Sequence, residues 1–152
     1  TFAGDHMMAR TIEEAKGMFR TYTQIHNAIR SRFKTLIEDG QGLATLYEND
    51  GQTAPTDNSM WCRFYIRDSA GQRLTVGVKN YRRSGLAVAQ LFGPAGQGDG
   101  ELIAVVDAIV AAFTSVSAGG VRYLTAYQQP VVLEEGRHQI NVLCPFEAEH
   151  QA

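Results

Sequence analysis

The stretch YRRSGLAVAQLFGPAGQGDGE, residues 81–101, contains the transition that decides the fold. Residues 86–92 alternate as a strand does, and neither face of that strand is strongly polar, which indicates burial on both sides. A loop rich in glycine follows, and an apolar helix begins near Asp99. The passage is therefore either a ligand-binding loop or a strand that holds copies of one protein together.

The residues before this stretch predict a helix and further strands. From Thr11 to Ile37 the pattern is helical, with Thr21 or Thr23 as a candidate cap, and one apolar stripe contains Ile25, Ala28, Ile29, Arg32, Phe33 and Leu36. Short strands are predicted at residues 43–47 and 73–81, with a turn at residues 69–72. MWCRFYIRD, residues 60–68, alternates, with one face formed by Cys62, Phe64 and Ile66 and the other by Trp61, Arg63, Tyr65 and Arg67.

The residues after the stretch complete an α+β pattern. The helix at residues 99–114 is apolar nearly all round, interrupted only by Glu101 and Asp107, so we expect cover on more than one side. Gly119 and Gly120 break it, and strands are predicted at residues 121–127 and 138–146, with a short extended piece at 131–133. The order predicts an α+β fold, a mostly antiparallel sheet with two helices packed on one face. We expect residues 1–10 to be a tag remnant and disordered start, residues 11–148 a single domain, and residues 149–152 a flexible tail.

Composition restricts the class of partner. The 152 residues are 44% hydrophobic and 20% charged, with a formal net charge of -2, so no global charge favours nucleic acid or an acidic membrane. No stretch is long and apolar enough to cross a bilayer, and no signal peptide is evident. Cys62 and Cys144 are predicted to be buried free thiols in a cytosolic setting.

Few residue patterns in the sequence indicate a catalytic or ligand-binding site. The loop GPAGQGDG, residues 93–100, contains G-x-x-G-x-G between a strand and a helix, but the lysine and hydroxyl of a phosphate loop are missing. No histidine, cysteine or acid spacing indicates a metal site, a catalytic nucleophile or a cofactor. Arg82 and Arg83 are either a solvated basic corner or part of an interface. Trp61 and Tyr65 either cover a second core layer or lie exposed for a partner.

Four motifs together resemble the phage tail terminator (tail completion) proteins of long-tailed phages. They are the strand with Trp61, Arg63 and Tyr65, then LTVG at 74–77, RRSGLAVAQLFGPAGQG at 82–98, and INVLCPFEA at 140–148. The resemblance covers residues 22–148. It implies a structural protein without enzymatic activity or cofactor, which forms a ring of six copies that caps the tail tube and ends tail polymerisation.

The resemblance also implies binding partners and a location in the virion. The partners are further copies of the chain, the tail tube protein and the head–tail connector protein; the place is the head-proximal end of the virion tail, after assembly in the host cytoplasm. We expect the oligomer or tube interface to contain Trp61, Tyr65, Arg82, Arg83, Phe92 and Pro94. The alternatives are another head–tail connector, neck or tail tube protein and, less favoured, an enzyme or small-ligand domain that uses the glycine-rich loop.

Overall fold

The computed structural model describes residues 21–48, 59–69, 72–73, 80–93, 100–132 and 138–151. The predictions for residues 1–20, for most of the strand at 73–81 and for the glycine-rich loop at 94–99 therefore lie outside the described residues. The helices are α2 (Tyr22–Phe33), the π-helical turn η1 (Lys34–Asp39) and α3 (Gly100–Ala112). The strands are β1 (Ala44–Tyr47), β2 (Trp61–Asp68), β3 (Gln72–Arg73), β4 (Asn80–Gly93), β5 (Val116–Ala118), β6 (Val121–Tyr123), β7 (Tyr127–Val132) and β8 (His138–Gln151).

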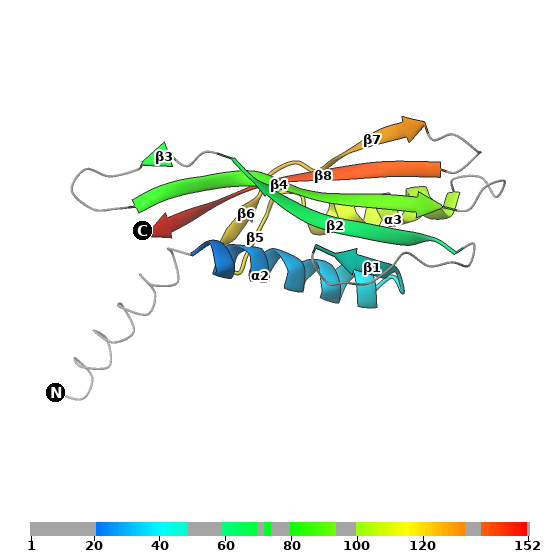
Figure 1. Ribbon diagram of the computed structural model, residues 1–152, viewed down its shortest axis with the longest axis horizontal. Coiled ribbons are helices and arrows are strands. Elements are labelled where there is room, and N and C mark those ends of the chain that lie inside the picture. Colours follow the sequence, from blue (N-terminus) through cyan, green and yellow to red (C-terminus); the bar gives the residue numbers. More distant parts are fainter. Residues whose placement is uncertain are drawn as a thin grey trace, which may run out of the picture.

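The strands form one long, twisted sheet with the order β1-β2-β4-β8-β6-β5 (Figure 1). β3 also pairs with β4, and β7 also pairs with β8. Only the β1–β2 pair is parallel; every other pair in the described sheet is antiparallel. The centre is the β4–β8 pair, which stays in register from Asn80↔Gln151 to Gly93↔His138. The predicted mostly antiparallel sheet is confirmed.

Helix α2 begins at a capping box. The Thr21 hydroxyl accepts the Gln24 backbone N–H at 3.2 Å, and the Gln24 side chain accepts the Thr21 backbone N–H at 2.9 Å. These two bonds satisfy donors that a helix N-terminus otherwise leaves unpaired, which decides between the two predicted caps in favour of Thr21. Ile25, Ile29 and Phe33 follow at four-residue spacing and are all fully buried. The chain then widens into the π-helical turn η1 and changes direction after it at Gly42, whose φ is 64°.

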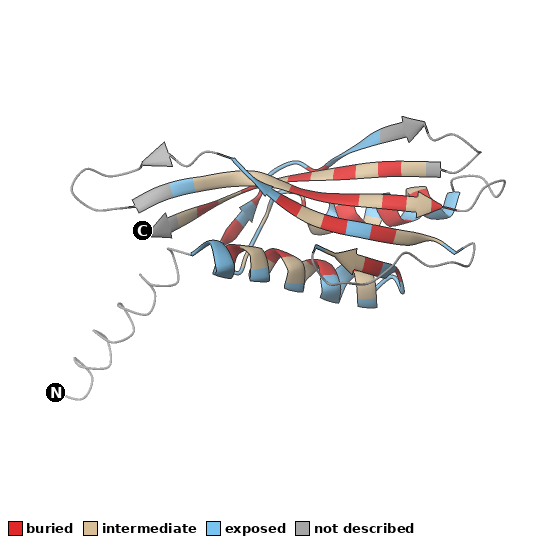
Figure 2. Ribbon diagram, viewed as in Figure 1, coloured by how far each residue is buried: buried red, intermediate tan, exposed pale blue. Residues whose placement is uncertain are grey.

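Both helices pack on one face of the sheet, as predicted. Phe33 of α2 stacks on Phe64 of β2 with ring centroids 4.2 Å apart, and it also contacts Phe113 just beyond α3 at 6.1 Å. These rings belong to a single core cluster that joins α2, α3 and the inward residues of β2, β4 and β8. Figure 2 shows the result as alternating buried and half-buried positions along β8, whereas β4 has three consecutive buried residues at 87–89.

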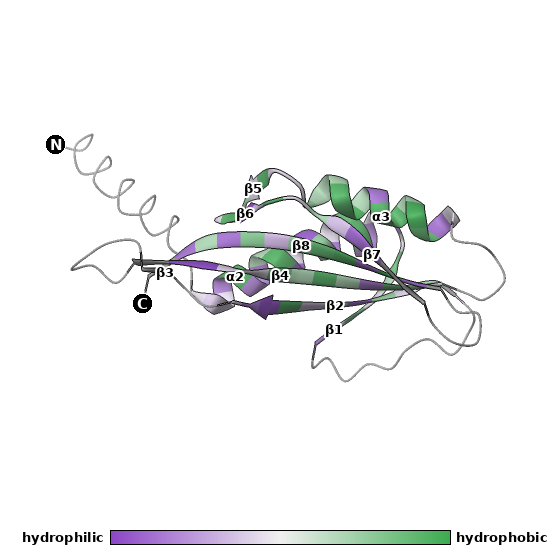
Figure 3. Cartoon of the chain, turned by 90° about the horizontal axis from the view of Figure 1, so that it is seen from above, coloured by the Kyte–Doolittle hydropathy of each residue, from purple (hydrophilic) through white to green (hydrophobic). Residues whose placement is uncertain are grey.

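Helix α3 differs from its prediction in one respect. Leu102, Val105, Val106 and Ile109 are buried against the core. Its outer side is exposed, although most of the helix is hydrophobic in Figure 3. The exposed positions are Gly100, Glu101, Ala104, Asp107 and Ala111. The expectation that α3 is covered on more than one side is therefore wrong for a single subunit.

Three strands also differ from the sequence prediction. β4 begins at Asn80 and runs through Gly85, where a side chain would lie 2.4 Å from the backbone oxygen of Arg67. Gly85 is thus a site of close backbone approach inside a strand, not a break before one. β5 and β6 form a hairpin that turns at Gly119 and Gly120, both with positive φ, and β5 was not predicted. β8 continues past Pro145 to Gln151, further than the sequence indicates.

Candidate functional site

The buried cysteines and the acidic groups offer no catalytic centre among the described residues. Cys62 and Cys144 are free thiols with no measurable exposure. Burial raises the pKa of the Cys144 thiol to about 12, and burial also raises the pKa of Cys62. Both thiols are therefore neutral near pH 7 and poor nucleophiles. Across the described ranges, no cluster of three or more histidine, cysteine or acidic side chains could hold a metal ion.

Among the described residues, no helix packs on the sheet face opposite α2 and α3, and we call this face the open face. It is formed by the outward residues of β2, β4, β8 and β7, which lie opposite one another in strict register. One row of directly opposed residues is apolar and crosses four strands: Tyr65, Val88, Leu143 and Tyr127. Tyr127 is 49% exposed, more than any other large hydrophobic residue among the described ones.

Polar residues flank this row on one side. The next row is formed by Arg63, Gln90, Asn141 and Gln129. The uncharged amides of this row are compatible with either water or a protein partner, because they hydrogen-bond to both. The composition of the open face is therefore mixed, as at a protein interface, and not uniformly charged, as on a solvated sheet face.

An aromatic and arginine corner lies at the β2 end of the open face. Trp61 and Phe92 are cross-strand neighbours, and their rings stack with centroids 4.3 Å apart. The Arg63 guanidinium lies over both, 5.6 Å from the Trp61 ring and 6.0 Å from the Phe92 ring. Such contacts are favourable even at exposed sites. Two of the predicted interface residues are thus joined in one cluster with Arg63.

An arginine side chain also lies close to the Tyr65 ring. The Arg67 guanidinium lies 5.3 Å from the Tyr65 ring, and both Arg63 and Arg67 are exposed. Within the described part of the chain, neither of these guanidinium groups contacts a carboxylate. The sequence predicts that both arginines lie on this strand face but does not identify them as interface candidates. The signal that could have found them is their period-two spacing with Trp61 and Tyr65.

Arg82 and Arg83 lie on opposite faces, because they are consecutive residues of one strand. Arg82 is exposed on the open face and lines a groove of about 420 Å³ beside Glu147 and Glu149. In the same groove Arg122 of β6 forms an ion pair with Glu147, its partner in register. Arg83 lies on the helix side, with its guanidinium 4.8 Å from the Tyr22 ring of α2. Pro94, the last predicted interface residue, lies outside the described residues.

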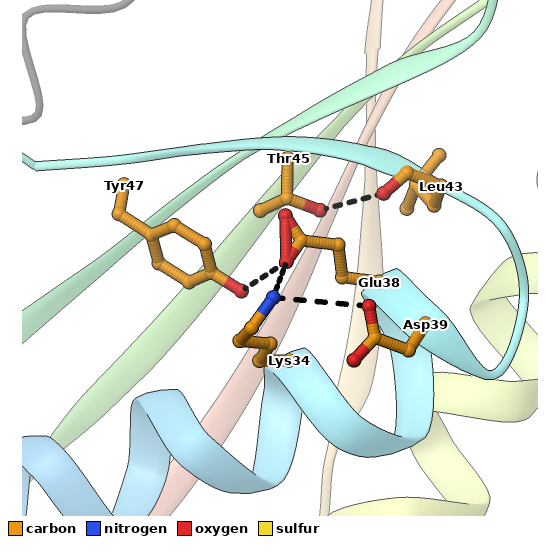
Figure 4. A network of polar contacts seen from close by, with 6 residues as sticks. All are labelled: Lys34, Glu38, Asp39, Leu43, Thr45 and Tyr47. Atoms are coloured by element: carbon orange, nitrogen blue, oxygen red, sulfur yellow. Dashed lines mark hydrogen bonds and ion pairs between the residues drawn. The ribbon is translucent and has the colours of Figure 1, made fainter.

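A polar network lies on the helix side, between η1 and the edge strand β1 (Figure 4). Lys34 Nζ is 3.3 Å from Glu38 Oε2 and 3.8 Å from Asp39 Oδ1, and the Tyr47 hydroxyl donates to Glu38 Oε2 at 3.4 Å. The hydrogen bond to Glu38 raises the pKa of Lys34, whereas burial and then Glu38 raise the pKa of Tyr47. The network holds η1 against β1, and its charges already have partners, which favours a structural role.

Comparison with known proteins shows which family the chain matches. A family model described as phage tail terminator protein matches residues 24–146. One solved protein structure, whose name describes no function, is 19% identical to the chain, with a TM-score of 0.64; the match covers 84% of this chain and 95% of that one. At this identity the likeness concerns the fold alone. The search of the curated proteins gave no match.

Proposed function

Because the chain belongs to the phage tail terminator family, we propose that it ends tail polymerisation by capping the head-proximal end of the tail tube as a ring. Family membership makes it a component of the phage tail and a participant in virion assembly. The ring, its six copies, and its docking to the tail tube protein and to the head–tail connector protein belong to the proposal. Assembly in the host cytoplasm belongs to it as well.

The observation that carries the proposal is the open face. Among the described residues, no helix packs over the apolar row, in which Tyr127 is exposed, Tyr65 and Leu143 are half-buried and Val88 is buried. The exposed Arg63 and Arg67 lie beside this row. Exposed aromatic and arginine residues are enriched at protein interfaces, and contiguous apolar surface is usually covered by a partner. A ring subunit needs such surface, because each copy must contact two neighbours and the tube.

The test is the length of tails assembled without this protein. Deletion of its gene from the phage is expected to give abnormally long tails, and the wild-type gene supplied in trans is expected to restore normal length. Tyr127→Glu places a charge on the open face and is expected to fail in this rescue. Leu36→Glu, at a similarly exposed position on η1, serves as the matched control and is expected to succeed; the two side chains are 49% and 39% exposed.

The other outcomes separate the alternatives. Tails of normal length that fail to join heads would indicate a connector, and the absence of any tail would indicate a tube subunit. Long filaments formed by the pure protein would also favour the tube. Tails of normal length that join heads normally would contradict all three roles.

A further inference from the structure

Contacts within the subunit do not account for the residue composition of the outer surface of helix α3. Its exposed side chains are Glu101, Ala104, Asp107 and Ala111, and the helix contains no lysine, arginine or histidine. An acidic residue in the first turn of a helix is favourable on its own, which accounts for Glu101. Asp107 lies in mid-helix, and within the described residues it forms no ion pair. The outer surface of α3 is therefore a strip of small side chains bordered by two carboxylates.

The open face has the opposite charge. Arg63 and Arg67 are exposed at its β2 edge and contact only rings among the described residues. They are four residues apart on a strand, or about 13 Å. Glu101 and Asp107 are six residues apart on a helix, or about 9 Å along its axis. The flexible arginine side chains can span that difference, so two guanidinium groups can reach two carboxylates.

The two surfaces cannot meet within one subunit. α3 buries Leu102, Val105 and Ile109 against the helix side of the sheet, so its outer surface and the open face point to opposite sides of the molecule. A contact between them must therefore join two copies. Because it joins different patches, it is heterologous, and it leaves one patch of each kind free for the next copy.

We propose that the outer surface of α3 in one copy covers the open face of the next copy. The proposal rests on the ring proposed above and names the contact that builds it. It buries the part of the apolar row that the single subunit leaves accessible, which is the exposed Tyr127 and the half-buried Tyr65 and Leu143. The small side chains of the helix allow it to approach the sheet closely. It also places helices on both faces of each sheet, the arrangement in which a two-faced sheet is fully covered. Complementary charge gives the contact its register.

Charge reversal in the full chain tests the contact. Arg63→Glu with Arg67→Glu, and separately Glu101→Arg with Asp107→Arg, should each weaken association at least about tenfold in sedimentation or light scattering. The chain with all four changes should recover, because attraction is restored with the signs exchanged. Arg30→Glu on α2 is the control and should have no effect. Circular dichroism confirms that each variant is folded.

Cross-linking gives a second, independent readout. A chain with both Arg67→Cys and Ala104→Cys should form disulfide-linked multimers on oxidation, while either single change should not give a ladder. Cys62 and Cys144 have no measurable exposure and should stay out of the reaction. The matched control combines Arg67→Cys with Asp39→Cys, which is exposed on η1.

The possible results of these experiments distinguish the proposed contact from the proposed terminator role. An oligomer that tolerates both charge reversals and gives no ladder overturns this contact but leaves the terminator role intact. A cross-link from Arg67→Cys to a tail tube subunit shows that the tube covers the open face and also overturns it. A wild-type chain that stays monomeric at high concentration and on tail tubes contradicts both the contact and the proposed ring.

Discussion

Arg32 joins the two helices, and its removal should destabilise the fold measurably. Its Nε and Nη2 atoms donate to the Ala112 carbonyl oxygen at 2.8 Å and 2.6 Å, at the last residue of α3. The guanidinium also lies 5.7 Å from the Phe113 ring and 5.5 Å from the Tyr123 ring. It therefore satisfies a carbonyl at a helix C-terminus, where positive charge is favourable, and packs on two core rings.

The size of the effect follows from these contacts. Hydrogen bonds from a charged group contribute about 1.5–3 kcal/mol, and a cation–π contact at a partly exposed site about 0.5–1 kcal/mol. Arg32→Met keeps the aliphatic stem and the helix propensity, and the side chain is half-buried, so we expect a loss of about 2 kcal/mol in the free energy of unfolding. For a chain of this size that corresponds to a fall of about 4–8 °C in Tm.

The assay is urea denaturation and thermal melting followed by circular dichroism. Arg30→Met is the control, because Arg30 lies one half-turn earlier on the same helix and makes no hydrogen bond or ion pair with the described residues. It should change the free energy of unfolding by less than about 0.5 kcal/mol. Equal losses in Arg32→Met and Arg30→Met would refute the idea that the contact to α3 holds the helices together.

Three further changes test the fold by the same melting assay. Gly85→Ala should cost roughly 1–3 kcal/mol because its side chain would meet backbone 2.4 Å away, whereas Gly100→Ala, with nothing within 4 Å, should be neutral or slightly stabilising. Thr21→Ala should cost about 1 kcal/mol through loss of the capping box, and Thr23→Ala clearly less. Folding raises the pKa of Cys144 from 9.0 to about 12, so its stabilisation is complete below pH 9 and is lost as pH rises toward 12. Cys144→Ala should flatten this fall in the free energy of unfolding between pH 9 and 12. An unchanged pH dependence would contradict the assignment of the fall to Cys144.

The sequence predicts those parts of the fold whose periodicity is long and regular. The spacing of Ile25, Ile29 and Phe33 predicts α2, and the alternation around Trp61 and Tyr65 predicts which side of β2 lies inward. These predictions succeed because burial on one face imposes a period on the residues. Short or unusual elements lack that signal. β5 has three residues and was not predicted. The strand at residues 43–47 was predicted and is β1, but its parallel pairing with β2 was not.

The open face could be predicted only in part. Alternation places Trp61 and Tyr65 on one face, but their neighbours on that face depend on strand register, which local sequence does not contain. Tyr127 joins the apolar row only because β7 pairs with β8 at Leu143. The sequence groups Arg82 and Arg83 together, either as a solvated basic corner or as part of an interface, although consecutive strand residues point to opposite faces.

The most direct test of the account is electron microscopy of the purified protein mixed with tail tubes assembled from their own subunit. The account predicts a ring of this protein at one end of each tube, with tube growth arrested at that end. A protein that remains a single subunit and leaves both tube ends bare and growing would contradict it.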